Sequence, residues 1–200
     1  MSAQRREEQA VGYTYDDYAR WDLKPEERME LIDGEVYMMA SPSWEHQDAQ
    51  ANLIGLFWQY LKGKDCKVFA APLDIRLEHD KGDKTVVQPD IVIICDKNKL
   101  TKPAIKGVPD LIVEILSPSS RSYDTVRKFN KYLQAGVKEY WILDPEANSL
   151  QVFVLKNGEY TVKTYGTDDK VKVSIFDDLE IELNDIFIPE ETSEEEQGDI

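Results

Sequence analysis

Two apolar segments decide the fold class: Val86-Val87-Gln88-Pro89-Asp90-Ile91-Val92-Ile93-Ile94 and Leu111-Ile112-Val113-Glu114-Ile115-Leu116. Both are rich in β-branched residues and are bounded by turn-forming residues, a pattern typical of central strands that are covered on both faces. A sheet of such strands needs helices on each side. The sequence therefore predicts an α/β fold in which each segment forms one central strand.

Helical and strand patterns surround these two segments. Helices are predicted at residues 14–21, 43–61 and 123–134, the last one ending near Gly136. Further strands are predicted at residues 29–32, 35–39, 73–77, 139–143, 151–155, 160–165, 171–175 and 179–183, with tight turns at Asp33-Gly34 and Asn157-Gly158. The expected architecture is a mixed β-sheet flanked by helices, followed by a β-rich C-terminal part.

An acidic residue interrupts each apolar segment: Asp90 the first and Glu114 the second. A carboxylate inside an apolar core costs several kcal/mol unless it is paired or bound to a metal. If the two strands are neighbours, both acids can bind one cation, and carboxylate oxygens suit Mg²⁺ or Mn²⁺. The alternative is a structural ion pair with Lys or Arg, which suits Glu114 poorly because its strand contains no base.

Other polar residues could extend this site. Asp74 could add a ligand, although exposure to solvent explains it well. Asp124, Lys128 and Tyr132 share one face of the helix at 123–134, so Lys128 can face the strand ends; helix periodicity alone favours a solvated Asp124–Lys128 pair. His46 could contact a phosphate or a ligand carboxylate, and a local hydrogen bond at the helix start explains it about as well.

Composition limits the possible functions. The chain has 200 residues, of which 42% are hydrophobic and 32% charged, as expected for one soluble domain. No apolar run is long enough to span a bilayer and residues 1–10 contain no signal-peptide core, so we expect a cytoplasmic protein without a membrane partner. The net charge of −15 argues against a protein that coats nucleic acid.

The predicted domain boundaries follow the same composition. We expect a flexible N-terminus at 1–12, one domain at 13–188 and a disordered tail at 189–200, in which acids occur without a base. Cys66 and Cys95 belong to no CxxC motif or Cys/His cluster, so structural zinc is not predicted. Two cysteines permit a disulfide, but a cytosolic chain keeps its thiols reduced, and we expect two small half-buried thiols.

An ordered series of motifs resembles the Uma2 family of endonucleases. The matching residues are Glu30-Leu31-Ile32-Asp33-Gly34-Glu35, His46, Pro89-Asp90, Val113-Glu114-Ile115-Leu116-Ser117-Pro118-Ser119, Asp124, Lys128, Tyr132, Gly136-Val137-Lys138-Glu139-Tyr140-Trp141 and Asp144-Pro145. The resemblance extends from Tyr13 to Ile188. It implies the restriction-endonuclease-like PD-(D/E)xK fold, a mixed sheet flanked by helices with metal-binding acids at strand ends.

The resemblance also implies roles for individual residues. Asp90 and Glu114 would be the catalytic acids that hold Mg²⁺ or Mn²⁺, with Glu30 as a further metal ligand and Glu35 as the second choice for it. The superfamily pattern has a lysine two residues after the second acid, where this chain has Leu116. Position 116 points the same way as Glu114 on a strand, and Lys128 could reach the same place from the following helix.

The resulting hypothesis is a metal-dependent endonuclease that hydrolyses nucleic-acid phosphodiester bonds. The metal would lower the pKa of a bound water, and Lys128 would orient that water or stabilise the developing negative charge. We expect DNA as a substrate bound without sequence preference, and a homo-oligomer, a dimer. Two alternatives are a non-catalytic interaction protein that keeps the nuclease fold, favoured by Leu116 and the net charge, and a metal phosphohydrolase acting on small phosphates.

Overall fold

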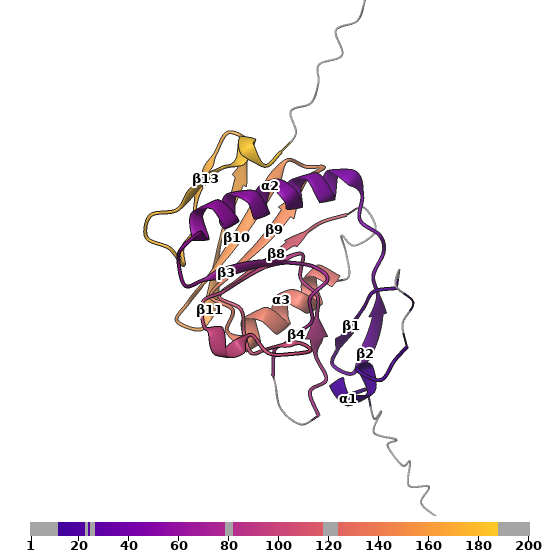
Figure 1. Ribbon diagram of the computed structural model, residues 1–200. Helices are drawn as coiled ribbons and strands as arrows, with labels where there is room; N and C mark the ends of the chain where they lie inside the picture. Colours follow the sequence, from indigo (N-terminus) through magenta and orange to yellow (C-terminus); the bar gives the residue numbers. More distant parts are fainter. Residues whose placement is uncertain (1–11, 23, 25–26, 79–81, 118–123, 188–200) are drawn as a thin grey trace, which may run out of the picture.

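A six-stranded sheet forms the centre of the computed structural model, which describes residues 12–22, 24, 27–78, 82–117 and 124–187 (Figure 1). The strand order is β11-β10-β9-β8-β6-β3, with β8 and β9 parallel and the other neighbours antiparallel. The strands are β3 (Lys67–Ala70), β6 (Ile91–Ile94), β8 (Leu111–Ile115), β9 (Glu139–Asp144), β10 (Ser149–Lys156) and β11 (Glu159–Gly166). The predicted mixed α/β sheet is confirmed.

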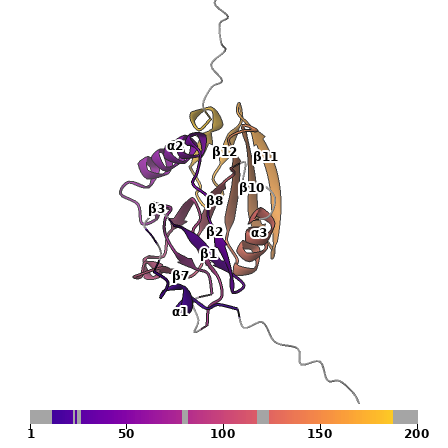
Figure 2. The same cartoon turned by 90° about the vertical axis from the view of Figure 1, so that its right-hand side faces the viewer.

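Two helices cover opposite faces of this sheet (Figure 2). Helix α2 (Trp44–Leu61) packs Leu53 and Phe57 into one core cluster, which also contains Ile91 and Val113. Helix α3 (Asp124–Ala135) packs on the other face, where Tyr132 and Ile112 belong to a second cluster. Successive strand residues point to opposite faces, so the apolar segments must be hydrophobic throughout, as the sequence predicted.

A smaller five-stranded sheet lies beside the first and carries the N-terminal part of the chain. Its order is β2-β1-β5-β4-β7, from β1 (Met29–Ile32), β2 (Glu35–Met38), β4 (Ile75–Arg76), β5 (Val86–Val87) and β7 (Ile105–Lys106). The hairpin of β1 and β2 turns at Asp33 and Gly34, which both have positive φ, as the sequence predicted. The short helix α1 (Tyr15–Tyr18) begins with a capping box made by Thr14 and Asp17.

The remaining elements complete the core on the α2 side. The hairpin of β12 (Lys170–Lys172) and β13 (Glu180–Glu182) is followed by the 3-10 helix η2 (Leu183–Asp185). Val171, Ile181 and Leu183 from these elements join the α2 cluster. A second 3-10 helix, η1 (Lys97–Lys99), follows β6. In the part of the chain that the structure describes, no helix has the length and apolar character needed to cross a bilayer.

The prediction of one continuous strand at residues 86–94 is wrong. The segment divides into β5, which belongs to the smaller sheet, and β6, which belongs to the larger one. Pro89 explains the division, because proline has no N–H to donate and cannot continue a central ladder. Gln88, Pro89 and Asp90 therefore form the passage between the two sheets, and this passage places Asp90 directly before β6.

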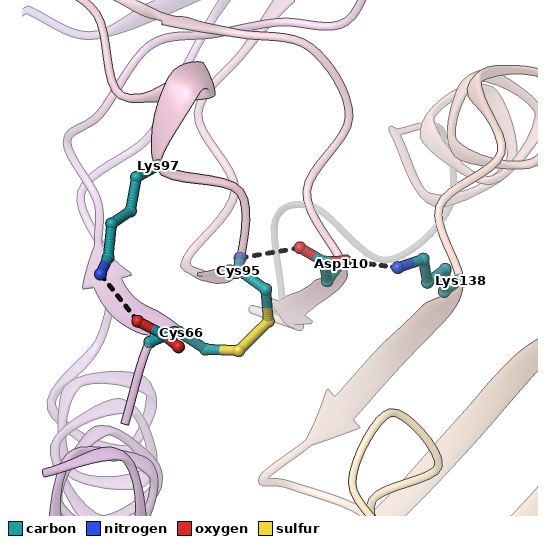
Figure 3. The surroundings of a disulfide bond; sticks show 6 residues. Cys66, Cys95, Lys97, Asp110 and Lys138 are labelled. Atoms are coloured by element: carbon teal, nitrogen blue, oxygen red, sulfur yellow. Dashed lines mark hydrogen bonds and ion pairs between the residues drawn. A yellow bond between two sulfur atoms is a disulfide. The ribbon is translucent and has the colours of Figure 1, made fainter. Parts of the chain in front are cut away.

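The expectation of two reduced thiols is also wrong, because Cys66 and Cys95 form a disulfide (Figure 3). The antiparallel register pairs Lys67 with Ile94, so the cysteines face each other one position beyond the ends of β3 and β6. Asp110 accepts a hydrogen bond from the Cys95 N–H at 2.8 Å and pairs with Lys138 at 2.6 Å. Sequence reasoning considered compartment but had no access to strand register. Residues 1–11 and 188–200, which contain most of the predicted flexible N-terminus and all of the predicted tail, lie outside the described residues.

Candidate active site

Strand register brings the two interrupting acids together. Antiparallel β6 and β8 pair Ile91 with Val113, which places Asp90 directly opposite Glu114. Glu114 follows the alternation of β8, so it points to the same face as Ile112, the face covered by α3, whereas Asp90 directly precedes β6. The predicted convergence of these carboxylates therefore follows from the pairing of the two apolar segments.

Helix α3 supplies the groups that contact Glu114. The Lys128 Nζ lies 3.2 Å from Oε1 and 3.3 Å from Oε2 of Glu114. The Tyr132 hydroxyl, fully buried one helical turn later, donates a hydrogen bond to Oε1 at 2.6 Å. The spacing of four residues thus directs Lys128 and Tyr132 to one carboxylate. Leu116, at the position of the superfamily lysine, packs beside the same cluster, and the Lys128 ammonium reaches Glu114 from the helix.

Glu30 contributes a third buried carboxylate from the smaller sheet. Its Oε2 lies 2.9 Å from the Lys128 Nζ, and its Oε1 accepts a hydrogen bond from the Gln88 N–H at 2.7 Å. Lys128 therefore lies between Glu30 and Glu114, with a side chain that is 6% exposed. One ammonium compensates two carboxylates contributed by different sheets.

Asp90 is held from three directions. Its Oδ2 accepts a hydrogen bond from the Ile115 N–H at 2.7 Å and lies 3.2 Å from the His46 Nε2. Its backbone oxygen accepts a hydrogen bond from the Gln50 side chain at 2.8 Å. His46 and Gln50 are one turn apart near the beginning of α2, where the Ser43 side chain accepts a hydrogen bond from the His46 N–H. The start of α2 thus fixes the Asp90 carboxylate.

Burial and mutual repulsion shift the proton affinities of this cluster. Burial raises the pKa of Glu114 to about 8, against the opposing effect of Lys128 and with a contribution from Asp90 and Glu30. Burial alone would lower the pKa of Lys128, but Glu114 and Glu30 outweigh it and raise that pKa. The site thus contains a carboxyl group that carries its negative charge at a high free-energy cost, and added positive charge would lower this cost.

These residues line one cavity of about 160 Å³. The acidic wall consists of Asp90, Glu114 and Glu30, with Lys128 among them. The end of β2 and the segment that connects it to α2 form an apolar wall, in which the lining residues are Met38, Met39, Ala40 and Pro42. Charged groups that can act on a substrate therefore lie at the junction of the two sheets, beside an apolar surface.

The other predicted site residues lie elsewhere or outside the description. Glu35 is exposed, and its carboxylate pairs with Arg127 at 3.0 Å outside the cavity lining. Asp74 accepts hydrogen bonds from the Tyr18 hydroxyl at 2.9 Å and the Gln88 amide at 2.8 Å, and it too is not a lining residue. Asp124 begins α3, and its side chain lies outside the described part.

Sequence reasoning missed three polar residues near the acids. Arg28 and Tyr140 line the cavity, and Gln88 bonds to both Arg28 and Glu30. Arg28 stands just before a predicted strand, and Tyr140 lies within an apolar run, so neither interrupts a pattern as Asp90 and Glu114 do. Gln88 could have been identified from the Pro-Asp motif, because it directly precedes Pro89 in the segment that connects the two sheets.

The donor set suits a hard divalent cation. Mg²⁺ and Mn²⁺ prefer carboxylate oxygens, and Mg²⁺ is commonly held by one or two carboxylates together with waters and substrate phosphates. Asp90 and Glu114 provide two such carboxylates, and the raised pKa of Glu114 shows that positive charge is locally favoured. Within the described ranges, no group of three or more His, Cys, Asp or Glu side chains is close enough to hold an ion jointly.

Comparisons with known proteins show the family and the fold of this chain. A family model, Uma2, described as "Putative restriction endonuclease", matches residues 15–184. Two similar proteins from Synechocystis sp. are uncharacterised: slr1290 is 25% identical over 160 residues, covering 79% of this chain and 83% of its own, and sll1609 is 28% identical over 131 residues, covering 64% and 72%. A crystal structure of a "putative nuclease belonging to DUF820" from Anabaena variabilis has a TM-score of 0.72 at 20% identity, covering 87% of this chain and 97% of that one. This structural similarity shows a common fold.

Proposed function

Because this chain belongs to the Uma2 family of restriction-endonuclease-like proteins, we propose that it is a metal-dependent endonuclease that hydrolyses nucleic-acid phosphodiester bonds. One observation carries the proposal: Asp90 and Glu114 face each other across β6 and β8 with Lys128 in contact with Glu114. Two carboxylates can hold a metal that activates water, and a lysine beside them can stabilise negative charge on the phosphate.

Asp90 and Glu114 would hold Mg²⁺ or Mn²⁺, which would activate a water and neutralise charge on the phosphate. The protein's own groups prepare this chemistry. His46 and the Ile115 N–H fix the Asp90 carboxylate, and Tyr132 fixes that of Glu114. The Lys128 ammonium would stabilise negative charge that develops on phosphate oxygens, because it is held in place by Glu30 and Glu114 before the reaction begins.

A non-catalytic interaction protein remains the second candidate. It is favoured by the ion pairs of Lys128, which already compensate Glu30 and Glu114 without a metal, and by the net charge of −15. The metal phosphohydrolase is favoured by no separate feature of the described residues. DNA as the substrate, a dimeric state and a cytoplasmic location belong to the endonuclease proposal as expectations from the sequence.

Calorimetric titration with Mn²⁺ separates the two candidates. The endonuclease should bind Mn²⁺, and Glu114→Gln should abolish binding, because the amide keeps the shape of the side chain and removes the charged ligand. Glu139→Gln is the matched control, since Glu139 is another buried glutamate on the neighbouring strand and does not line the cavity. Absence of Mn²⁺ binding by the unmodified protein would favour the non-catalytic candidate, and normal affinity in Glu114→Gln would remove Glu114 from the site.

A further inference from the structure

Three buried polar atoms without partners gather at the cavity. Among the described residues, the buried side-chain atoms without a hydrogen bond are Arg28 Nη2, His46 Nδ1, Tyr140 OH and Asp83 Oδ1. The first three belong to residues that line the cavity, whereas Asp83 does not. A buried polar group without a partner costs about 1–3 kcal/mol, so three of them at one place indicate a site that a polar ligand completes.

Of the three residues with an unpartnered atom at the cavity, Arg28 is the one that must carry a positive charge. Guanidinium is permanently protonated in proteins and offers only donors, so its free Nη2 calls for an acceptor, and an anion is the best one. The cavity has a volume of about 160 Å³. That space is large enough for a phosphate group.

A chain of hydrogen bonds fixes the orientation of the Arg28 side chain. Its Nε donates to Gln88 Oε1 at 3.1 Å, and the Gln88 amide nitrogen donates to Asp74 Oδ1 at 2.8 Å. The Tyr18 hydroxyl donates to the same Asp74 oxygen at 2.9 Å. Arginine can only donate and a carboxylate can only accept, so the amide of Gln88 has one possible orientation. With Nε engaged by Gln88, the Nη2 group remains for a ligand.

We propose that Arg28 binds a phosphate of the nucleic-acid substrate beside the acids, and that Gln88 and Asp74 act as its positioning residues. This inference rests on the proposed function. The Arg28 backbone oxygen accepts a hydrogen bond from the Met39 N–H at 2.9 Å, which ties the start of β1 to the segment that forms the apolar wall. A phosphate bound by Arg28 would therefore lie between that wall and the carboxylates. The role assigned to Asp74 is indirect, in place of the metal ligand that the sequence suggested.

The test measures binding of a short fluorescein-labelled single-stranded DNA by fluorescence anisotropy, in EDTA so that no cleavage occurs. Affinity is compared between about 50 and 200 mM NaCl for the wild type, Arg28→Gln, Arg28→Lys and the control Arg20→Gln. Arg20 is exposed and lies outside the cavity lining. Thermal melting of each variant establishes that it is folded.

We expect Arg28→Gln to weaken binding about tenfold and to reduce the slope of log affinity against log salt by about one, because one phosphate contact is lost. Arg28→Lys should keep most of the slope and recover part of the affinity, and Arg20→Gln should match the wild type. Equal affinity and slope for Arg28→Gln and wild type would overturn the inference, as would a wild type that binds no DNA. A wild type that binds DNA in this manner but cleaves none would contradict the proposed endonuclease and leave the phosphate site supported.

Discussion

At the scale of single residues, Lys128 decides the electrostatics of the site. It is buried between Glu30 and Glu114, and both contacts are 3.2 Å or shorter. Removing one partner of a buried ion pair leaves an uncompensated charge, which is more damaging than the loss of an exposed pair. The neighbouring Lys131 provides the comparison, because it pairs with Asp33, whose side chain is 66% exposed.

The first prediction compares Lys128→Ala with Lys131→Ala. We expect Lys128→Ala to lower the free energy of unfolding by about 3–5 kcal/mol and Lys131→Ala by less than about 1 kcal/mol, measured by urea denaturation. With Mn²⁺, Lys128→Ala should retain metal binding and lose about 100-fold in cleavage rate, because an ammonium is not a metal ligand. Equal loss of cleavage in both variants would indicate a general basic patch, and full activity in Lys128→Ala would exclude Lys128 from catalysis.

Residue type alone predicted part of this site. Asp90 and Glu114 stand out in the sequence because each interrupts an apolar segment, and the structure places them opposite each other. Periodicity alone favoured a solvated position for Lys128, whereas the side chain is buried. Arg28 could not be identified, because its importance depends on a cavity shared by two sheets. A position at the meeting point of distant segments is a property of the tertiary structure.

At the scale of secondary-structure elements, strand register determines which side chains meet. The length and composition of the apolar segments predicted central strands, but the division of one of them at Pro89 was not predicted. The pairing of β3 with β6 was beyond the sequence, since β3 was not predicted as a strand. The register of β6 with β8 aligns Asp90 with Glu114, and the register of β3 with β6 aligns Cys66 with Cys95.

The second prediction concerns this disulfide. The cysteines are 29 residues apart, and a loop of that length corresponds to about 3.5 kcal/mol of stabilisation through the unfolded state. A reducing agent should lower the free energy of unfolding by about this amount, and the double variant Cys66→Ser with Cys95→Ser should be insensitive to it. Mn²⁺ affinity should not change on reduction, because Asp90 lies at the opposite end of β6 from Cys95. An altered affinity, or unchanged stability on reduction, would contradict this prediction.

The third prediction concerns pH and the link between β9 and the segment after β12. Glu139 is fully buried and accepts hydrogen bonds from Trp141 Nε1 at 2.8 Å and the Ile175 N–H at 3.0 Å. Burial raises the pKa of Glu139 from 4.5 to about 7, against the opposing effect of these hydrogen bonds. Between these pH values the folded protein holds a proton that the unfolded chain releases, so stability falls as pH rises through this window.

The expected size of this effect is about 3 kcal/mol, because each pKa unit corresponds to about 1.4 kcal/mol. Glu139→Gln cannot ionise, so the difference in unfolding free energy between the variant and the wild type should shift by this amount in favour of the variant from pH 4 to pH 8. Urea denaturation across that range measures it. A difference that does not depend on pH would show that Glu139 ionises normally in the folded protein.

At the scale of the whole molecule, the net charge of −15 and the position of the cavity together determine how nucleic acid can bind. An acidic protein has no broad electrostatic attraction for nucleic acid, so binding must depend on a few local contacts. The cavity at the junction of the two sheets concentrates such contacts, with Lys128 and Arg28 among the acids. Cleavage should therefore be measurable at low salt and should decrease as salt is added, with the modest slope expected for a few phosphate contacts.

Cleavage of end-labelled DNA and RNA is the decisive measurement for endonuclease activity. Single-stranded DNA, double-stranded DNA and RNA are incubated at low salt with Mn²⁺ and the wild type, Glu114→Gln or Glu139→Gln. We predict that the wild type and Glu139→Gln cleave at least one of these substrates, that EDTA stops the reaction, and that Glu114→Gln does not cleave, because it lacks the carboxylate that faces Asp90. No cleavage of any substrate by the wild type, or equal cleavage by Glu114→Gln, would contradict the assignment of this site as a metal-dependent endonuclease.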